Sequence, residues 1–288
     1  MAGRDYDRIA AHFTAARCDE LLRLGYTVID DFHGAAWAGA LREELLQLAA
    51  RGMAPNRTQF SSPDSGVLVF SKPHVFEADL HEPALAASFG STLREFGAWF
   101  AGSAAHFVPA LASRLPQLQL RGGDRGRTVK LQYNDGGGGS FPTHYDNPGP
   151  PNARALTMLV YLNAGWAPGD GGEFVLLPFL DRPVVVQPRM DRAVVFLSDR
   201  LLHRTEPSRR ARLAVTTWID GDAPREAGLR LPPSALQARA ARAVPRRALA
   251  HPAPSRRTWR RRRRCFARPP CSAPCRAQST RRCVVALM

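Results

Sequence analysis

Short extended runs separated by glycine and proline fill residues 127 to 219, and they constrain the fold of this chain more than any other feature. Apolar runs of about four to eight residues with turn formers between them are typical of an antiparallel sandwich or barrel. The predicted strands are Arg127–Tyr133, Phe141–Asp146, Ala155–Leu162, Glu173–Leu177, Val184–Gln187, Ala193–Leu197 and Arg212–Ile219. We therefore predict a mainly β protein with flanking helices, whose core is a double-stranded β-helix (jelly roll) buttressed by N-terminal helices.

The first third of the chain predicts helices and one strand. The expected elements are a helix over residues 7–24, a strand over Tyr26–Phe32, and two helices marked by apolar stripes at residues 37–48 and 85–100. Residues 53–75 carry turn formers and no sustained period, so we expect a long loop there with a functional or mobile role.

The basic charge of the chain lies near its end. Of the 40 Lys and Arg residues, 15 lie in residues 239–288, where all 15 are arginine and no residue is acidic. Residues 1–238 therefore hold 25 basic and 25 acidic side chains and are neutral, although the net charge of the chain is +15. This distribution gives no support for a nucleic-acid surface on the folded part, and nucleic acid is a candidate partner only for the Arg-rich tail.

The tail itself has a composition that cannot form a core, with Arg260–Arg264 set among Pro, Ser and Ala, so we expect it to be disordered. A nuclear-import or nucleic-acid segment and an artefact of the gene model are the alternatives. Four cysteines lie in the tail at a spacing that is poor for a zinc finger: Cys265, Cys271, Cys275 and Cys283. Only Cys18 remains elsewhere, which fits a reducing compartment.

The length and hydropathy of the chain set its expected organisation and location. Its start lacks the apolar run of a signal peptide, and no stretch approaches the roughly 20 apolar residues of a membrane span, so we expect a cytoplasmic or nuclear protein with no membrane partner. About 230 residues of mixed composition can bury one core. We predict an N-terminal support region over residues 1–126, the jelly-roll core over residues 127–225, and the tail over residues 239–288.

Two histidines and one aspartate form a candidate metal site. In His144-Tyr-Asp146 the two-residue period of a strand places both side chains on one face, about 6.6 Å apart at Cα from a rise of ~3.3 Å per residue. His203 would complete the set if the strand before it, Ala193–Leu197, runs beside the first. Two imidazoles and one carboxylate, with positions left open, are the ligand set of non-haem Fe(II) oxygenases. Taken singly, His-x-Asp and a lone histidine are more often surface features.

An arginine on the last predicted strand strengthens the case for an anionic co-substrate. Arg212 shares one face with Ala214, Thr216 and Trp218, while the opposite face of the same strand is nearly all apolar. A strand this apolar is expected to be covered on both sides, so the guanidinium needs a buried anionic partner. A bound dicarboxylate would supply one, with Thr216 as an extra donor. An edge-strand arginine that reaches solvent is the alternative.

In order and spacing, these motifs resemble the Fe(II)- and 2-oxoglutarate-dependent dioxygenases of the prolyl 4-hydroxylase type, and among them the oxygen-sensing prolyl hydroxylases most of all. The motifs are His144-Tyr-Asp-Asn-Pro148, Tyr161-Leu-Asn163, Gly171-Gly-Glu173, Asp191-Arg192, Ser198-Asp-Arg200 and the segment from His203 to Trp218. The resemblance covers residues 127–222 well and the strand at Tyr26–Phe32 more faintly.

The resemblance implies a role for each matched residue. The iron ligands, which form the catalytic set, would be His144, Asp146 and His203. Arg212 would pair with the distal carboxylate of 2-oxoglutarate and Tyr161 would hydrogen-bond it, with Thr216 and Tyr133 lining the same pocket. Fe(II), 2-oxoglutarate as co-substrate and ascorbate as reductant are the implied cofactors. Asp191 and Asp199 match family positions, and we interpret them as turn and capping residues.

The implied reaction hydroxylates a substrate while 2-oxoglutarate and O2 become succinate and CO2. Peptidyl proline at C4 is favoured by the resemblance, and residues 53–75 together with Gly136–Ser140 could form a lip for a protein or peptide. Both segments differ in sequence from those of the oxygen-sensing enzymes, and the glycine run could equally be a plain linker. The alternatives are a dioxygenase that acts on a small molecule or another residue, a sensor without turnover, and a non-enzymatic nucleic-acid-binding protein that uses the tail.

Overall fold

The computed structural model describes residues 8–62, 66–100, 107–121, 127–179 and 181–222. Contacts divide the chain into two units, Met1–Leu231 with Ala286–Met288, and Pro232–Val285, and every described residue belongs to the first unit. The predictions made for the tail over residues 239–288 fall outside the described residues. The first unit joins the expected support region and the expected core, since both contribute strands to one sheet.

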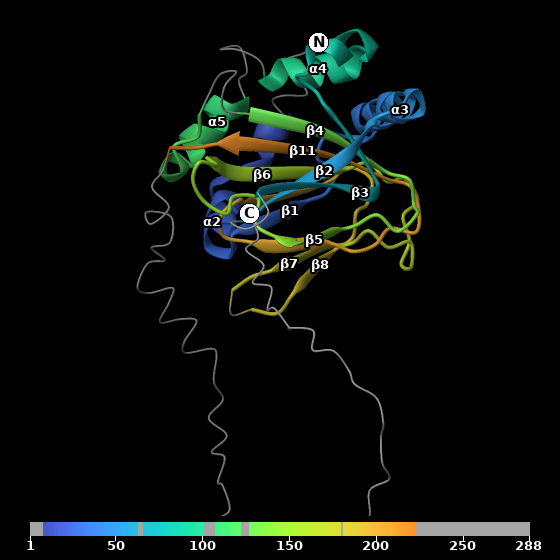
Figure 1. Ribbon diagram of the computed structural model, residues 1–288. Helices are drawn as coiled ribbons and strands as arrows, with labels where there is room; N and C mark the ends of the chain where they lie inside the picture. The colour runs from blue at the N-terminus through green and yellow to red at the C-terminus, as the bar shows by residue number, and fades with distance from the viewer. Residues whose placement is uncertain (1–7, 63–65, 101–106, 122–126, 180, 223–288) are drawn as a thin grey trace, which may run out of the picture. The chain divides into compact units, whose positions relative to one another are not determined.

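Two antiparallel sheets make up the body of this unit (Figure 1). The larger has the strand order β1-β9-β6-β11-β4-β3-β2 and the smaller has the order β5-β10-β7-β8. This arrangement confirms the predicted jelly roll. The strands are β1 Tyr26–Ile29, β2 Ala54–Ser62, β3 Gly66–Asp79, β4 Arg127–Asn134, β5 Phe141–His144, β6 Arg154–Tyr161, β7 Phe174–Leu177, β8 Val184–Val186, β9 Arg192–Leu197, β10 Leu202–Thr205 and β11 Arg212–Asp220.

Helices cover the outer face of the larger sheet, as predicted (Figure 1). They are α2 Ala15–Leu24, α3 Ala35–Arg51, α4 Ser91–Phe100 and α5 Phe107–Arg114, with the 3-10 turns η1 Pro83–Ser88 and η2 Pro116–Leu118. The expected stop at Gly25 is confirmed, because this residue ends α2 with φ of 85° and donates its N–H to Leu21 O. Thr14 caps the start of the same helix.

The single helix predicted over residues 85–100 is divided into η1 and α4. The chain opens at Gly90, where the Glu44 carboxylate of α3 comes so close that a Cβ atom would lie 2.3 Å from its carbon. That carboxylate accepts the N–H groups of Thr92 and Leu93 at 2.8 Å each. A side chain from another helix therefore caps α4, and spacing within one segment could not predict this contact.

Alternation along the strands separates two apolar layers. On β11, Leu213, Val215 and Ile219 face the cluster shared with the helices, whereas Ala214 faces the layer between the sheets. The same alternation on β6 and β9 sends Val160 and Val195 to the helix side and Leu159 and Val194 to the space between the sheets. The prediction that β11 is covered on both sides is confirmed. Polar residues on its inner face must therefore line an internal space.

The prediction of a loop over residues 53–75 is wrong, because β2 and β3 pair there as an antiparallel hairpin. The N-terminal region thus supplies three strands to the larger sheet where one was expected. Val69 and Phe70 on this hairpin are 51% and 52% exposed. Hydrogen bonds between the backbones of β2 and β3 hold this hairpin together where its side chains are exposed. The strands therefore form without the alternation of apolar and polar residues by which the other strands were predicted.

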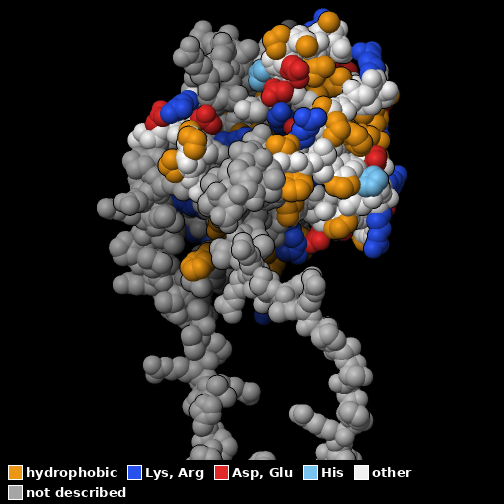
Figure 2. Space-filling model, viewed as in Figure 1, with side chains coloured by type: hydrophobic (Ala, Val, Ile, Leu, Met, Phe, Trp, Pro, Cys, Tyr) orange, Lys and Arg blue, Asp and Glu red, His pale blue; other side chains and the backbone are white. Residues whose placement is uncertain are grey.

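The described surface carries both signs of charge together. Figure 2 shows acidic and basic side chains interspersed on one face, in agreement with the neutral balance of residues 1–238. Among the described residues, no helix combines the length and the apolar character that crossing a bilayer requires.

Candidate metal centre

Two neighbouring strands of the smaller sheet bring His144 and His203 together. β5 and β10 pair antiparallel with these two residues directly opposite each other, and their ring centroids lie 4.3 Å apart. The condition set on the sequence, that Ala193–Leu197 runs beside the first strand, is not met, since β9 belongs to the larger sheet and β5 to the smaller. His203 instead lies on β10, a strand of four residues that the sequence analysis missed because it has no apolar alternation.

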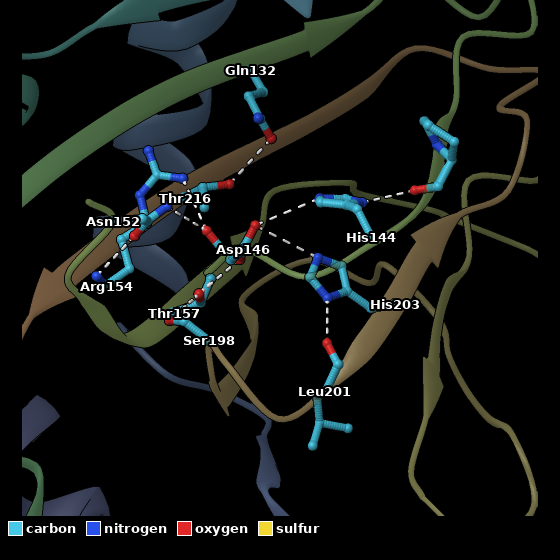
Figure 3. A network of polar contacts seen from close by, with 11 residues as sticks. Gln132, His144, Asp146, Asn152, Arg154, Thr157, Ser198, Leu201, His203 and Thr216 are labelled. Carbon is cyan, nitrogen blue, oxygen red and sulfur yellow. Dashed lines mark hydrogen bonds and ion pairs between the residues drawn. The ribbon is translucent and has the colours of Figure 1, made fainter. Parts of the chain in front are cut away.

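Asp146 lies two residues beyond the end of β5 and completes the group (Figure 3). Its Oδ1 atom is 3.5 Å from His144 Nε2 and 3.7 Å from His203 Nε2. Its Oδ2 atom accepts a hydrogen bond of 2.7 Å from the Thr157 hydroxyl, which also lies 2.9 Å from the Ser198 hydroxyl. One carboxylate oxygen is thus fixed by the larger sheet, while the other faces both imidazoles.

The hydrogen bonds of the two histidines set their tautomers. Nδ1 of His144 lies 2.7 Å from Pro142 O, and Nδ1 of His203 lies 3.0 Å from Leu201 O. A carbonyl can only accept, so each Nδ1 carries the proton and each neutral ring keeps a lone pair on Nε2. The three candidate ligand atoms of the group lie within 4.8 Å of one another. Two imidazole nitrogens and one carboxylate oxygen therefore converge in the arrangement that suits a divalent transition metal.

Charge and burial prepare these groups for a metal. Burial alone would raise the pKa of Asp146, but the adjoining His144 and His203 and the hydrogen bond from the Thr157 hydroxyl outweigh it and hold this pKa well below its ordinary value. Burial lowers the pKa of His203, although Asp146 opposes the shift. An ionised carboxylate and a neutral imidazole are the forms that bind a metal, so neither group needs to change protonation at neutral pH.

Replacing Thr157 with valine is expected to weaken metal binding about 10- to 100-fold, because the Asp146 carboxylate would lose the donor that orients it. The measurement is a titration of the metal-free protein with Mn(II). Thr217→Val is the matched control, since Thr217 is an equally buried threonine on β11 whose hydroxyl has no hydrogen bond among the described residues. Equal affinities for the two variants would contradict the orienting role of Thr157.

Arg212 lies buried in the same internal space. Its Nε atom donates to Gly172 O at 3.0 Å, and its guanidinium carbon lies 5.0 Å from the centroid of the Tyr161 ring. No described carboxylate pairs with it, in agreement with the expectation from the sequence. The buried Tyr161 hydroxyl has Arg212 as its polar neighbour and no acceptor among the described residues. A buried cation and a buried donor beside it call for an anion.

Thr216 and Tyr133 take different positions. Thr216 lines the cavity and donates to Gln132 Oε1 at 3.1 Å (Figure 3). Tyr133 does not line the cavity, because it packs on the helix side of β4 with its ring centroid 6.3 Å from that of Phe76. Adjacent residues of a strand point to opposite faces, so Gln132 occupies the place that was expected for Tyr133.

One cavity of about 1070 Å³ contains these groups. His144, Asp146 and His203 line it together with Arg212, Thr216 and Trp218. Tyr161 is fully buried beside Arg212 and is not among the residues that line the cavity. The cavity lining also includes Lys72, Gln132 and Arg154, which have no motif of their own and were not predicted from the sequence.

The glycine run of residues 136–139 is a packed turn and does not line this cavity. A Cβ atom on Gly137 would lie 2.3 Å from the His74 ring, and one on Gly139 would lie 2.8 Å from His74 O. Hydrogen bonds of 2.9 and 3.1 Å join Gly138 and Gly139 to Ser208. Close approach of neighbouring segments requires glycine at positions 137 and 139. The run is therefore a packed connection between β4 and β5, and it does not form the expected lip of the cavity.

Lys72 of β3 adds a partly buried positive charge to the cavity wall. Its Nζ atom lies 4.3 Å from the centroid of the Phe141 ring. Burial lowers the pKa of this lysine from 10.5 to about 8, while Glu77 and Asp146 oppose the shift. The unfolded chain therefore binds more protons than the folded chain between pH 8 and 10.5, and stability should rise with pH in this range.

Replacing Lys72 with methionine is accordingly expected to raise the free energy of unfolding at pH 7, by up to ~3 kcal/mol. The gain should shrink as the pH rises from 8 to 10.5, because the wild-type lysine then loses its buried charge. Urea unfolding of both proteins across this range measures it. Lys130→Met, which removes a lysine 3.5 Å from Asp79 and 3.6 Å from Glu77, is the control and should not stabilise the fold. A gain for Lys72→Met that does not depend on pH would contradict the argument.

Comparison with known proteins identifies the family. The model of the 2OG-Fe(II) oxygenase superfamily matches residues 130–220, which include every candidate metal ligand. A crystal structure of a prolyl 4-hydroxylase from Phytophthora capsici is 43% identical in sequence, with a TM-score of 0.66, over 81% of this chain and 72% of that chain. This chain belongs to the prolyl 4-hydroxylase family of 2OG-Fe(II) oxygenases.

Two further proteins are similar to this chain, one in sequence and one in fold. A hypoxia-inducible factor prolyl hydroxylase of Caenorhabditis elegans is 27% identical over 220 residues, which is 73% of this chain, but the chain spans only 28% of the length of that protein. A Trichoplax adhaerens prolyl hydroxylase, solved with a peptide fragment of the hypoxia-inducible factor, has the same fold, with a TM-score of 0.58 at 22% identity over 78% of this chain and 94% of that chain.

The family assignment fixes the cofactors of this oxygenase as Fe(II) and 2-oxoglutarate, as the motifs had implied. The donor set and the buried, unpaired Arg212 suit these two groups. Asp191 lies outside the cavity, where its carboxylate accepts the N–H groups of His33 and Gly34 at 2.9 and 2.7 Å at the start of α3. This confirms its expected capping role. Asp199 likewise lies outside the cavity, 3.9 Å from Arg200 Nε.

Proposed function

We propose that this oxygenase hydroxylates peptidyl proline at C4. In the balanced reaction, a C–H bond at C4 becomes C–OH with one oxygen atom of O2, and the other oxygen enters succinate as 2-oxoglutarate loses CO2. The observation that carries the proposal is the single cavity that holds both the His144, Asp146 and His203 group and Arg212. Its volume of about 1070 Å³ exceeds what a small co-substrate needs, so there is room for a peptide segment.

The residues divide the work within this cavity. His144, Asp146 and His203 would hold Fe(II), which, when bound, supplies the activation of O2. Arg212 would pair with the distal carboxylate of 2-oxoglutarate, and the Tyr161 hydroxyl, which has no acceptor among the described residues, would donate to it. Thr216 would line the same pocket. Phe174 and Phe196 pack on His203, with ring centroids at 5.1 and 4.8 Å. These rings exclude water from one side of the metal ligands and so protect a reactive site.

An aromatic surface in the cavity supports proline as the substrate. Trp218 lies on the inner face of β11, and the Arg154 guanidinium lies 4.0 Å from the centroid of its ring. The arginine fixes the indole, whose flat apolar face suits a saturated five-membered ring. The C. elegans relative and the P. capsici relative are both named as prolyl hydroxylases, which agrees with this choice. Other peptide residues and small molecules are the alternative substrates that the experiment must distinguish from proline.

The test incubates the full chain with Fe(II), ascorbate, 2-oxoglutarate and proline-containing peptides, and follows succinate and peptide mass. We expect one added oxygen on proline, with 4-hydroxyproline after hydrolysis. Trp218→Ala should raise the KM for the peptide at least tenfold while 2-oxoglutarate still binds. Trp166→Ala is the control, because that indole donates to Gly171 O outside the cavity. Peptide-independent succinate, or oxygen on a different residue, would replace the proline proposal.

A further inference from the structure

A second cavity of about 330 Å³ adjoins the first. The two share the lining residues Arg121, Pro150, Asn152, Ala153 and Arg154. Arg200 and Asp199, from the segment after β9, line only the second cavity. A peptide bound in the first cavity therefore has a neighbouring hollow into which a flanking side chain can extend.

Two arginines place a partly buried positive charge in this second cavity, with no close ion pair: Asp199 acts on Arg200 from 3.9 Å, and Asp146 and Asp220 act on Arg154 from a greater distance. Arg200 is 17% exposed, its Nε atom is buried without a hydrogen bond among the described residues, and its nearest carboxylate oxygen, on Asp199, lies 3.9 Å away. Arg154 has no carboxylate within 4.0 Å in the described part of the chain, and its Nη1 atom lies 3.5 Å from the backbone oxygen of Asp146. Burial lowers the pKa of both guanidinium groups.

The other charged groups of this cavity are already paired. Arg121 Nε donates to Asp222 Oδ1 at 2.7 Å, and its Nη2 atom also contacts that oxygen. Asp199 is the remaining acid in the lining. With Arg121 and Asp222 neutralising each other, Arg154 and Arg200 share one remaining carboxylate in the lining, that of Asp199, which lies 3.9 Å from Arg200 Nε. The cavity therefore favours an anion, and a planar carboxylate matches the fork of a guanidinium.

The segment between the two cavities is held rigidly to the metal centre. Asn152 Nδ2 donates to Asp146 O at 3.0 Å, and Asn152 Oδ1 accepts from the Arg154 N–H at 2.9 Å. Asn147 Nδ2 donates to Arg154 O at 2.7 Å (Figure 3 shows Asn152 and Arg154 beside Asp146). The second cavity thus keeps a fixed offset from Asp146, and a residue bound there would lie at a fixed spacing from the residue that reacts.

We propose that the second cavity binds an aspartate or glutamate side chain of the peptide substrate, through Arg154 and Arg200. This proposal rests on the proposed function for its peptide, but the ligand chemistry of the cavity can be tested without turnover. It makes the enzyme select peptides that carry an acidic residue at one spacing from the target residue. Arg200 is a specificity residue here and does not touch the reacting atoms.

The first arm of the test uses the holoenzyme with Mn(II) and saturating 2-oxoglutarate, so that the metal site and Arg212 are occupied. Arginines are modified with phenylglyoxal in the presence of acetyl-Gly-Asp-Gly-amide, acetyl-Gly-Asn-Gly-amide or acetyl-Gly-Gly-Gly with a free C-terminus, and the sites are quantified by mass spectrometry. We expect the Asp probe to slow the modification of Arg200 at least threefold relative to the Asn probe. Arg209, which is exposed, reports general reactivity and should not change.

The second arm measures kcat/KM for amidated proline peptides in which one Asp, or its isostere Asn, is moved through each flanking position. At one spacing, Asp should exceed Asn by about tenfold, because a hydrogen-bonded charge replaces a neutral group. Arg200→Gln should bring this ratio close to one, and Arg209→Gln should preserve it. Urea unfolding checks that both variants are folded.

The outcomes separate the two proposals. Protection of Arg200 by the Asp probe without hydroxylation of any proline peptide would remove the proline substrate but keep the acid-binding cavity. Hydroxylation with no preferred Asp position and no protection of Arg200 would overturn the cavity proposal alone. Protection only by the free C-terminus would also overturn it, because the bound group would then be a chain end. A ratio that survives Arg200→Gln would show that the selectivity arises elsewhere.

Discussion

Replacing His203 with alanine is expected to abolish the formation of succinate from 2-oxoglutarate, with a fall in rate of more than about 100-fold. Residues that only orient a metal ligand already contribute about 10- to 100-fold, so removal of a ligand should cost more. His203 is 3% exposed and lies directly opposite His144, so its replacement by alanine removes one of the two imidazole ligands from the cavity wall. The measurement follows succinate at saturating Fe(II) and 2-oxoglutarate, alongside a Mn(II) titration of each protein.

His81→Ala is the matched control, since His81 is exposed and lies outside the cavity. This variant should keep wild-type turnover and wild-type metal affinity. A folded His203→Ala protein that still binds Mn(II) as tightly as the wild type would contradict the assignment of His203 as a ligand. Succinate formation by His203→Ala at the wild-type rate would contradict a role for His203 in the reaction.

Replacing Arg212 with methionine should have opposite consequences with and without 2-oxoglutarate. The guanidinium is buried and unpaired with any described carboxylate, so its removal should leave the metal-bound, co-substrate-free protein within about 1 kcal/mol of the wild type or make it more stable. Loss of one partner of a buried charge pair costs about 2–5 kcal/mol, so the Kd for 2-oxoglutarate should rise at least ~30-fold. Calorimetric binding and thermal unfolding measure the two effects.

The thermal experiment separates binding from folding. At a co-substrate concentration of about 100 times the wild-type Kd, the wild type should gain roughly 2.7 kcal/mol, and the Arg212→Met protein should gain less than about 1 kcal/mol at the same concentration. Arg209→Met, on the exposed loop before β11, should respond as the wild type does. Equal stabilisation of Arg212→Met and wild type by 2-oxoglutarate would exclude Arg212 from the binding site.

The sequence predicted those parts of the site that depend on strand periodicity. Arg212 and Thr216 lie on one face of β11 because residues two and four apart on a strand share a face, and both line the cavity. His144 and Asp146 converge for a similar reason, although Asp146 lies just past the end of β5. The apolar opposite face of β11 correctly indicated a buried strand and hence an arginine without solvent.

The pairing of strands that are distant in the sequence could not be predicted from the pattern of residues within each segment. β10 has no alternation of its own and forms because it lies between β5 and β7, so the position of His203 depends on two partners far away in sequence. Tyr133 was placed in the cavity from motif resemblance, yet the register of β4 with β11 turns Gln132 inward instead. Lys72 belongs to a hairpin whose strands lack the alternation of apolar and polar residues that predicts a strand, which is why no pattern identified it.

The three candidate ligands also have a mechanical consequence for the protein. His144 and His203 belong to the smaller sheet, whereas the Asp146 carboxylate is fixed to Thr157 of the larger one. A metal ion bound by all three therefore forms a reversible cross-link between the two sheets. In the metal-free protein, β5 and β10 should open more often and exchange their backbone amide hydrogens faster. Cellular iron would then set how long each molecule survives proteolysis, as well as whether it turns over.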